Sequence, residues 1–128
     1  AAHSVSYPFT SYFKIPHGHA VALTLPHFIQ FNNNVDAGSV KDARGVLFVK
    51  ERMKELVEII GCTTASGAKH KIIKIMKEIG LETSLINLGI SKKELDIIVE
   101  NGFNPQRVKN NPRKITKSQL RKILERII

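Results

Sequence analysis

Histidines gather at the start of this chain. Four of its five histidines fall within residues 1–34, namely His3, His17, His19 and His27. Imidazole is a common ligand for divalent transition metals, and it can also transfer a proton near neutral pH. His3 and His17 stand 14 residues apart, which along one straight helix is about 21 Å and too far for both rings to reach one ion. Shared coordination therefore requires a break in the chain between them.

A break is expected at residues 15–16, because the residue before a proline avoids the helical conformation. A first helix then ends before Pro16, and a second begins near His17. If these helices fold past each other, His3 and His17 can share a metal. His19 lies about 200° around the second helix from His17 and is not expected to face the same ion. The spacing permits a metal site without establishing one; the alternative is that these histidines are partly buried and bonded to backbone carbonyls.

The other ligands of a metal site are not found near these histidines. Catalytic metals usually take three or more protein ligands, and no aspartate or glutamate occurs before Asp36. Any carboxylate ligand must therefore come from elsewhere. His27, by contrast, is expected to pack within the second helix, which Pro26 should kink by removing a backbone donor.

Helical patterns account for most of the remaining chain. Apolar residues recur at helical spacing before Gly61 and before Gly80, and each glycine can end a helix. Two capping boxes mark further helix starts, formed by Ser91 with Glu94 and by Thr116 with Gln119. Residues 105–112 have a proline at each end and predict a loop between the last two helices. No segment alternates strictly between apolar and polar residues, so we expect an all-α fold, a compact bundle of five to seven helices.

Positive charge is concentrated at the other end of the chain. The 128 residues suit one compact domain, with 20 basic and 11 acidic side chains and a net charge of +9. Residues 104–128 hold eight lysines and arginines against one acid, Glu125. This basic segment raises the alternative of a small helical module that binds nucleic acid, although only Phe103 lies near it as a platform for base stacking. A third reading is that the basic face meets a phosphate-bearing ligand or an acidic subunit face.

Membrane and redox signals are few. No apolar run reaches the roughly 18 to 20 residues of a membrane span, so no membrane partner is expected. The one cysteine, Cys62, excludes an internal disulfide and favours a reducing compartment, so we expect a cytoplasmic protein. No capping residue precedes Ala1, and the sequence is expected to begin inside a helix of a longer protein.

The opening segment carries a family resemblance. Residues 1–32 read A-A-H-S-V-S-Y-P-F-T-S-Y-F-K-I-P-H-G-H-A-V-A-L-T-L-P-H-F-I-Q-F-N, with a specific P-H-G-H-A core. This segment resembles a signature of the iron-dependent (group III) alcohol dehydrogenases, in which one histidine and a second, 14 residues later, bind the metal. The segments L-E-T-S-L-I-N-L-G-I-S at 81–91 and N-N-P-R-K-I-T at 110–116 are similar to the closing segments of that family.

The resemblance implies roles for four residues. His3 and His17 match the two metal ligands, while Tyr7 and His19 would be catalytic residues near the substrate or cofactor. The metal would be iron(II), zinc or another divalent ion, acting as a Lewis acid on the substrate oxygen while hydride passes between the substrate and NAD(H) or NADP(H). Many members have histidine where this chain has Tyr7, and tyrosine is a poor base near neutral pH. The S-Y-P-F-T variant is similar to the branch that reduces phosphonoacetaldehyde to hydroxyethylphosphonate.

The resemblance also implies a place in a longer enzyme. Residues 1–128 would be the C-terminal helical metal-binding domain, and the N-terminal nucleotide-binding domain, with a further Asp and His ligand, would lie upstream. The expected partners are a small alcohol or aldehyde, the N-terminal part of the same enzyme and further copies in a homo-oligomer. The fragment alone is expected to bind metal weakly and to be inactive.

Overall fold

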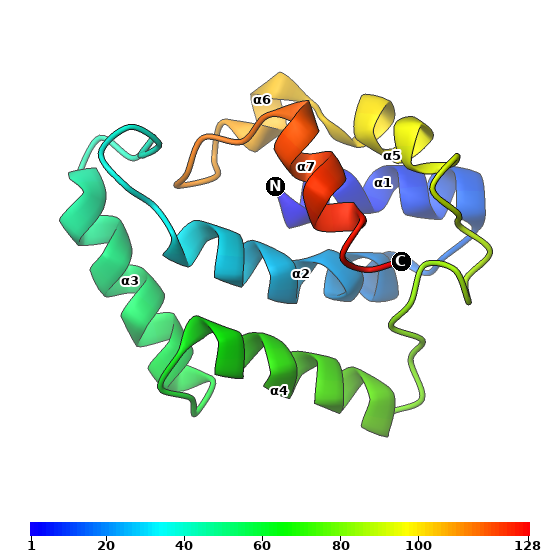
Figure 1. The fold of residues 1–128 in the computed structure, drawn as a ribbon, viewed down its shortest axis with the longest axis horizontal. Helices are drawn as coiled ribbons and strands as arrows, with labels where there is room; N and C mark the ends of the chain where they lie inside the picture. The colour runs from blue at the N-terminus through cyan, green and yellow to red at the C-terminus, as the bar shows by residue number, and fades with distance from the viewer.

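The computed structural model describes residues 1–128 as helices and loops without a strand (Figure 1). The helices, in chain order, are α1 (Ala2–Phe13), α2 (His17–Asn33), α3 (Gly45–Ile59), α4 (Ala65–Glu78), α5 (Leu95–Gly102), α6 (Pro105–Val108) and α7 (Lys117–Leu124). The only extended pairing is an isolated bridge between Val40 and Arg113. No helix has both the length and the apolar character that a bilayer crossing needs. The expected all-α class and number of helices are confirmed.

The break expected between the first two helices is present. Lys14 ends α1 in the left-handed conformation, with φ of 60°. The N–H of Ile15 then donates to the carbonyl of Phe9 (3.3 Å), which satisfies a carbonyl at the helix end. Pro16 precedes α2 with φ of −54°, the value that its ring favours. The chain therefore reverses here, and α1 packs against α2.

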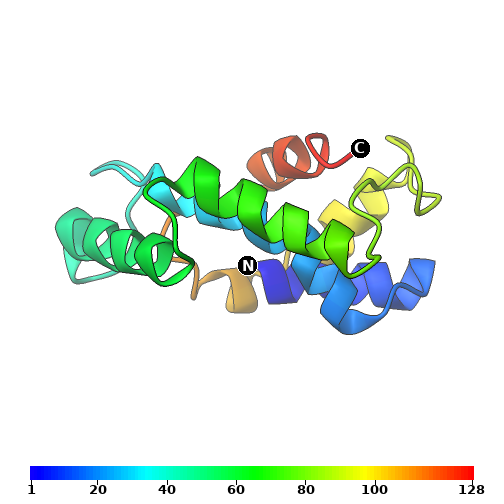
Figure 2. The ribbon, with the colours of Figure 1, turned by 90° about the horizontal axis from the view of Figure 1, so that it is seen from below.

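Helix α2 is the centre of the fold (Figure 1). It packs against α1 and α7 above it in this view and against α4 below it, while α3 lies across one end. The larger core cluster joins α1, α2, α5 and α7 around the fully buried Phe9, Leu95 and Leu120. The smaller cluster joins the end of α2 to α3 and α4 around Val49 and Ala68. Figure 2, turned by 90°, shows α4 running alongside α2.

Helices α3 and α4 form a hairpin whose ends follow the sequence prediction. Gly61 after α3 and Gly80 after α4 have φ of 77° and 80°, a conformation that glycine adopts without the clash that a Cβ would cause. Thr64 caps α4, because its hydroxyl accepts a hydrogen bond from the N–H of Gly67 (3.0 Å). Short-range sequence signals therefore set both ends of this hairpin.

The two predicted capping boxes differ in outcome. At α7, the Thr116 and Gln119 side chains accept hydrogen bonds from each other's backbone N–H groups, as predicted. At α5, the Glu94 carboxylate accepts from the N–H of Ser91 (2.8 Å). Residues 92–94 form a turn, however, and α5 begins only at Leu95. The prediction of a helix starting directly after Ser91 is therefore wrong by one turn.

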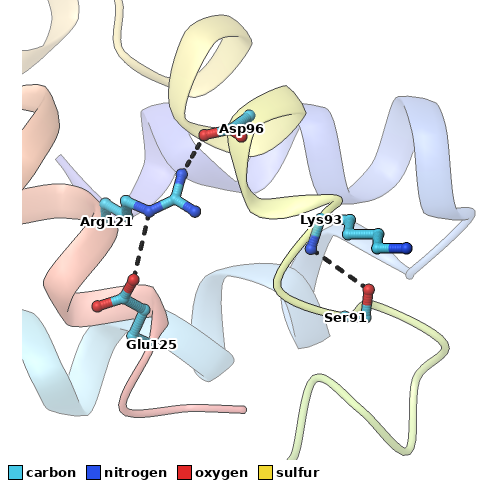
Figure 3. Close-up of polar contacts among 5 residues, drawn as sticks. All are labelled: Ser91, Lys93, Asp96, Arg121 and Glu125. Atoms are coloured by element: carbon cyan, nitrogen blue, oxygen red, sulfur yellow. Dashed lines mark hydrogen bonds and ion pairs between the residues drawn. The ribbon is translucent and has the colours of Figure 1, made fainter.

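An arginine ties α7 to α5 (Figure 3). Arg121 on α7 donates to the carboxylate of Asp96 on α5, and its Nε donates to Glu125 one turn further along α7 (3.3 Å). Below this polar bridge, the buried Leu120 and Leu124 face the larger core. The bridge therefore fixes the outer side of a helix whose inner side is held by apolar packing.

The segment between α5 and α7 is not only a loop. Pro105 is the first residue of the short helix α6, and the Asn104 side chain accepts from the N–H of Gln106 (2.9 Å). Proline at this position loses no hydrogen bond, because the first helical N–H groups have no partner inside the helix. The prediction that residues 105–112 are only a loop is therefore wrong at Pro105–Val108, which form a short helix.

Candidate metal centre

Three ring side chains meet where α1 passes the start of α2. On α1, Nε2 of His3 lies 3.1 Å from the hydroxyl oxygen of Tyr7, one turn away. The ring of His17, the first residue of α2, has its centroid 4.9 Å from that of His3 and 5.8 Å from that of Tyr7. All three side chains are exposed. The structure therefore brings His3 and His17 together, and we call the three residues the His–Tyr cluster.

A buried serine orients the His17 ring. The Ser6 hydroxyl donates its proton to the carbonyl of His3 (2.7 Å). Towards Nδ1 of His17, 3.3 Å away, the same oxygen must therefore act as an acceptor, which assigns the proton to Nδ1. This tautomer leaves the lone pair of Nε2 free. Such a bond to the other ring nitrogen is the usual way in which proteins fix a metal-binding imidazole.

Close packing against α5 sets the position of α1. The hydroxyl of Ser4 donates to the carbonyl of Gly102 on α5 (2.7 Å). A Cβ built on Gly102 would lie 3.1 Å from the Cα of Val5 and 3.3 Å from Cγ of Pro8, so no larger residue fits without a shift of α1. Because Val5 is buried against α5, the exposed face of the same helix presents His3 to solvent.

A hollow of about 380 Å³ adjoins the His–Tyr cluster. Its walls come from α1 and from the segment around α6, and they consist of Ala1, His3, Ser4, Tyr7, Gln106, Arg107 and Asn110. The Arg107 guanidinium lies over the Tyr7 ring, 4.4 Å from its centroid, which is cation–π distance. One cation thus lines a hollow that opens beside two imidazoles. No local sequence signal marks Arg107 as part of this site, because α6 brings it to Tyr7 of α1 from 100 residues away in the chain.

His19 lies apart from the cluster. Its Nε2–H donates to the carbonyl of Glu82 (2.7 Å), and the ring is half-buried against the segment that precedes α5. The Glu82 carboxylate in turn accepts from the N–H groups of Thr83 (2.7 Å) and Ser84 (2.9 Å), and these bonds lower its pKa. His19 therefore joins α2 to a hydrogen-bonded turn, and its catalytic role stays a prediction.

The chain offers two metal donors at this place and no complete set. No group of three or more His, Cys, Asp or Glu side chains converges anywhere in residues 1–128. The two imidazoles come from different helices, and Nε2 of His17 has a free lone pair because the proton of that ring is on Nδ1. This donor chemistry fits half of a site for a divalent transition metal, with the remaining ligands supplied from outside the chain.

His27 also lies outside the cluster. Its side chain is buried on α2, and Nδ1 has no hydrogen-bond partner. Burial, together with the positive charges of Lys69 and Arg126, lowers the pKa of His27 to about 4. Its predicted packing role is confirmed by this burial.

Comparison with known proteins relates the whole chain to one family. The family profile described as "Fe-containing alcohol dehydrogenase family, C-terminal" matches residues 1–128. The NADPH-dependent butanol dehydrogenase of Clostridium saccharobutylicum is 29% identical over 125 residues, covering 96% of this chain and 31% of that protein. The phosphonoacetaldehyde reductase of Streptomyces viridochromogenes is 28% identical over 124 residues, covering 97% of this chain and 30% of that protein.

Solved structures show the same fold. The sulfoacetaldehyde reductase from Bifidobacterium kashiwanohense, in complex with NAD+, matches 98% of this chain and 30% of its own, with a TM-score of 0.75 and 26% identity. The alcohol dehydrogenase from Oenococcus oeni matches 99% of this chain and 32% of its own, with a TM-score of 0.78 and 24% identity. The chain thus spans about a third of the length of these relatives.

These comparisons bear on one of the alternatives raised by the charge pattern. They do not support the nucleic-acid-binding alternative, because the profile covers the basic segment together with the histidines. They also agree with the resemblance carried by the P-H-G-H-A core and by the two downstream segments. On the match over its full length, this chain belongs to the Fe-containing alcohol dehydrogenase family and corresponds to its C-terminal helical region.

Proposed function

We propose that this chain supplies two protein ligands, His3 and His17, to the metal site of an NAD(P)-dependent alcohol dehydrogenase. That enzyme interconverts an alcohol and an aldehyde by hydride transfer. The observation that carries the proposal is the approach of the two imidazoles to 4.9 Å between centroids across the α1–α2 break. Family membership supports the oxidoreductase class, and the nicotinamide cofactor would be held by the rest of the enzyme.

The metal would be held through these imidazoles and through ligands from outside the chain. When bound, a divalent ion such as iron(II) or zinc supplies Lewis-acid polarisation of the substrate oxygen. Ser6 keeps the His17 ring in one tautomer, so that Nε2 presents its lone pair. The Tyr7 hydroxyl lies 3.1 Å from Nε2 of His3. When this oxygen accepts from Nε2–H it orients the ring, and the lone pair for the metal is then on Nδ1 of His3.

Arg107 favours a substrate with an anionic group. Its guanidinium lines the hollow beside His3 and stacks on Tyr7 without a carboxylate partner. A phosphonate or sulfonate on a short aldehyde could bond to this cation while the aldehyde oxygen points towards the imidazoles. Two of the relatives are named for aldehydes of this kind, phosphonoacetaldehyde and sulfoacetaldehyde. We therefore propose an anionic short-chain aldehyde as the substrate class.

Metal titration of the 128-residue chain tests the ligand assignment. Cobalt(II) or zinc(II) should shift the ring signals of His3 and His17 in NMR spectra, with weak affinity because only two donors are present. His3→Ala and His17→Ala should each weaken binding by about tenfold or more. His70→Ala is the matched control, since His70 is an exposed histidine on α4 away from the cluster.

The result that contradicts the assignment is equally specific. If either variant of the cluster binds metal as the unmodified chain does, while its circular dichroism spectrum is unchanged, His3 and His17 are not a ligand pair. The substrate class has a separate test with the zinc-loaded chain. Hydroxyethylphosphonate should shift the Tyr7 ring signals, on which Arg107 stacks, and ethanol should not; Arg107→Gln should abolish the difference.

A further inference from the structure

A second hollow, of about 250 Å³, lies at the C-terminal end of α2, far from the His–Tyr cluster at its start. The end of α2 and the inner side of α7 line it, with the segment between α6 and α7. We call it the basic pocket, and its lining residues are Gln30, Phe31, Asn34, Arg113, Gln119, Lys122, Ile123 and Arg126. His17 and Phe31 are 14 residues apart on α2, so the basic pocket and the His–Tyr cluster are about 20 Å apart along the helix.

The cations of the basic pocket have no carboxylate within ion-pair distance; Asp36, whose pKa is lowered mainly by its bonds to Ser39 and in part by the charge of Arg113, lies outside the lining. Arg113, Lys122 and Arg126 all line it, and no aspartate or glutamate does. None of the three forms an ion pair. The neighbouring Lys117 and Arg121, by contrast, pair with Glu100 and Asp96 on α5, and Arg121 also pairs with Glu125. The positive charge that the sequence analysis found near the C-terminus therefore gathers partly in one concave place.

The uncharged polar groups of the basic pocket are also arranged as donors. The amide oxygen of Gln30 accepts from Nζ of Lys69 (3.3 Å), and that of Gln119 accepts from the N–H of Thr116 (2.9 Å). With both oxygens engaged, the NH₂ group of each amide is the end left free. A ligand in the basic pocket therefore meets cations and N–H donors but few acceptors.

One of the three cations is held in place before any ligand arrives. Arg113 donates through Nη1 to the carbonyl of Phe31 (2.8 Å) and through Nε to the hydroxyl of Ser39 (3.3 Å). Its guanidinium also lies over the Phe31 ring, 4.3 Å from the centroid. These contacts leave Nη2 without a protein acceptor. A fixed guanidinium loses little side-chain freedom when it binds an anion.

We propose that the basic pocket binds a phosphate group, either as inorganic phosphate or as the phosphate of a small monoester. A phosphate dianion offers several acceptor oxygens for these donors and two charges for the three cations. The apolar wall of Phe31 and Ile123 gives the organic part of a monoester a surface to contact. The proposal is independent of the metal site, because it shares no residue with the His–Tyr cluster.

His27 provides a reporter beneath the basic pocket. The positive charges of Lys69 and Arg126 contribute to its low pKa, after burial. Burial first, and then the charge of Arg126, lower the pKa of Lys69. A phosphate held by Arg126 would offset these charges, so the pKa of His27 should rise when the basic pocket is filled.

Titration of the chain with inorganic phosphate and with phenyl phosphate in 0.15 M sodium chloride, by NMR, tests the proposal. Saturable shifts are expected at the side-chain NH₂ groups of Gln30 and Gln119 and at Nε of Arg113, with a rise in the His27 pKa. Lys122→Gln and Arg126→Gln should each weaken binding by about tenfold. Lys92→Gln, which removes an exposed lysine before α5, should leave the affinity unchanged.

The two ligands distinguish the source of the phosphate. Tighter binding of phenyl phosphate, with shifts at Phe31 and Ile123, identifies a monoester site, and equal affinities identify a site for the free anion. Absence of saturable binding overturns the proposal, as does an equal loss in Lys92→Gln, which would mean attraction by net charge alone. Binding of duplex DNA with a steep salt dependence, but not of either small ligand, would also overturn it.

Discussion

Ser6 is the side chain that links the His17 ring to the backbone of His3. It is fully buried, and one hydroxyl both donates to the His3 carbonyl and lies 3.3 Å from Nδ1 of His17. Ser6→Ala should therefore free the His17 ring to change its rotamer and tautomer, and weaken zinc binding by about tenfold, since outer contacts of this kind typically contribute 10- to 100-fold to metal affinity. The measurement is a zinc titration followed by NMR.

Ser11→Ala is the matched control for this variant, because Ser11 is an exposed serine on the same helix. It should bind zinc as the unmodified chain does. Equal affinities of the Ser6→Ala and unmodified chains would mean that the ring of His17 is positioned by other contacts.

His27 makes the stability of the chain depend on pH. Burial first, and then the charges of Lys69 and Arg126, lower its pKa from about 6.5 to about 4. The unfolded chain therefore binds more protons than the folded chain between these two values, so stability is complete above pH 6.5 and falls as the pH decreases towards 4. The expected loss is about 3 kcal/mol. Urea unfolding at a series of pH values measures it.

His27→Leu should remove this part of the pH dependence, whatever its effect on absolute stability. His70→Leu should keep it, because His70 is exposed. Several carboxyl groups also have lowered pKa values, among them Glu82 and Glu94, and they add losses at the acid end in every variant. The difference between the His27 variant and the unmodified chain isolates the histidine, and identical slopes would refute the prediction.

At the scale of the elements, the contact of α1 with α5 has the least room. Gly102→Ala would place a Cβ 3.1 Å from the Cα of Val5, and a backbone atom cannot yield as a side chain can. The substitution should destabilise the chain by about 1–3 kcal/mol and displace His3 and Tyr7 with α1. Urea unfolding measures the first effect, and the chemical shifts of the two rings report the second.

Gly18→Ala is the control for the glycine substitution. Gly18 lies in α2, and a Cβ there would have no atom within 4 Å, so alanine should be neutral or stabilising by up to about 1 kcal/mol. A Gly102→Ala chain as stable as the original would mean that α1 can move away from α5 at no cost.

The start of α7 and its link to α5 should differ in energetic importance. Thr116→Ala removes a side-chain cap and half of a capping box, at an expected cost of about 1 kcal/mol. Asp96→Asn removes the charge that pairs with Arg121 (Figure 3). Because the Asp96 and Arg121 side chains are 69% and 37% exposed, the substitution should cost less than about 0.5 kcal/mol. Thermal unfolding of both variants ranks them, and the reverse order would contradict this account.

Local signals predicted most of the helices but not the sites that distant segments bring together. Apolar periodicity and terminal glycines predicted α3 and α4, and the Ile15–Pro16 break permitted the approach of His3 to His17 without establishing it. The start of α5 was misplaced, because a Ser–Glu capping pattern also fits a turn. Arg107 and the basic pocket could not be predicted, because their residues come together only through packing of distant segments.

At the scale of the whole molecule, the two core clusters predict two levels of stability. The larger cluster contains 16 buried residues from most of the helices, while the smaller contains 7, around α3 and α4. Opening α3 exposes only the smaller cluster, so its amides should exchange hydrogen faster than those of α1, α2 and α7. Hydrogen exchange followed by NMR measures this. Uniform protection across the chain would show that the two clusters unfold as one unit.

The reversal between α1 and α2 limits how the chain can change in length. Inserting one residue between His3 and Tyr7 would rotate His3 by about 100° about the α1 axis relative to the residues that follow, and would carry it off the face that it shares with Tyr7. The same insertion in the exposed loop at residues 36–38 would leave every ring of the His–Tyr cluster in register. Natural insertions and deletions in relatives of this chain should therefore be absent from α1 and common between α2 and α3.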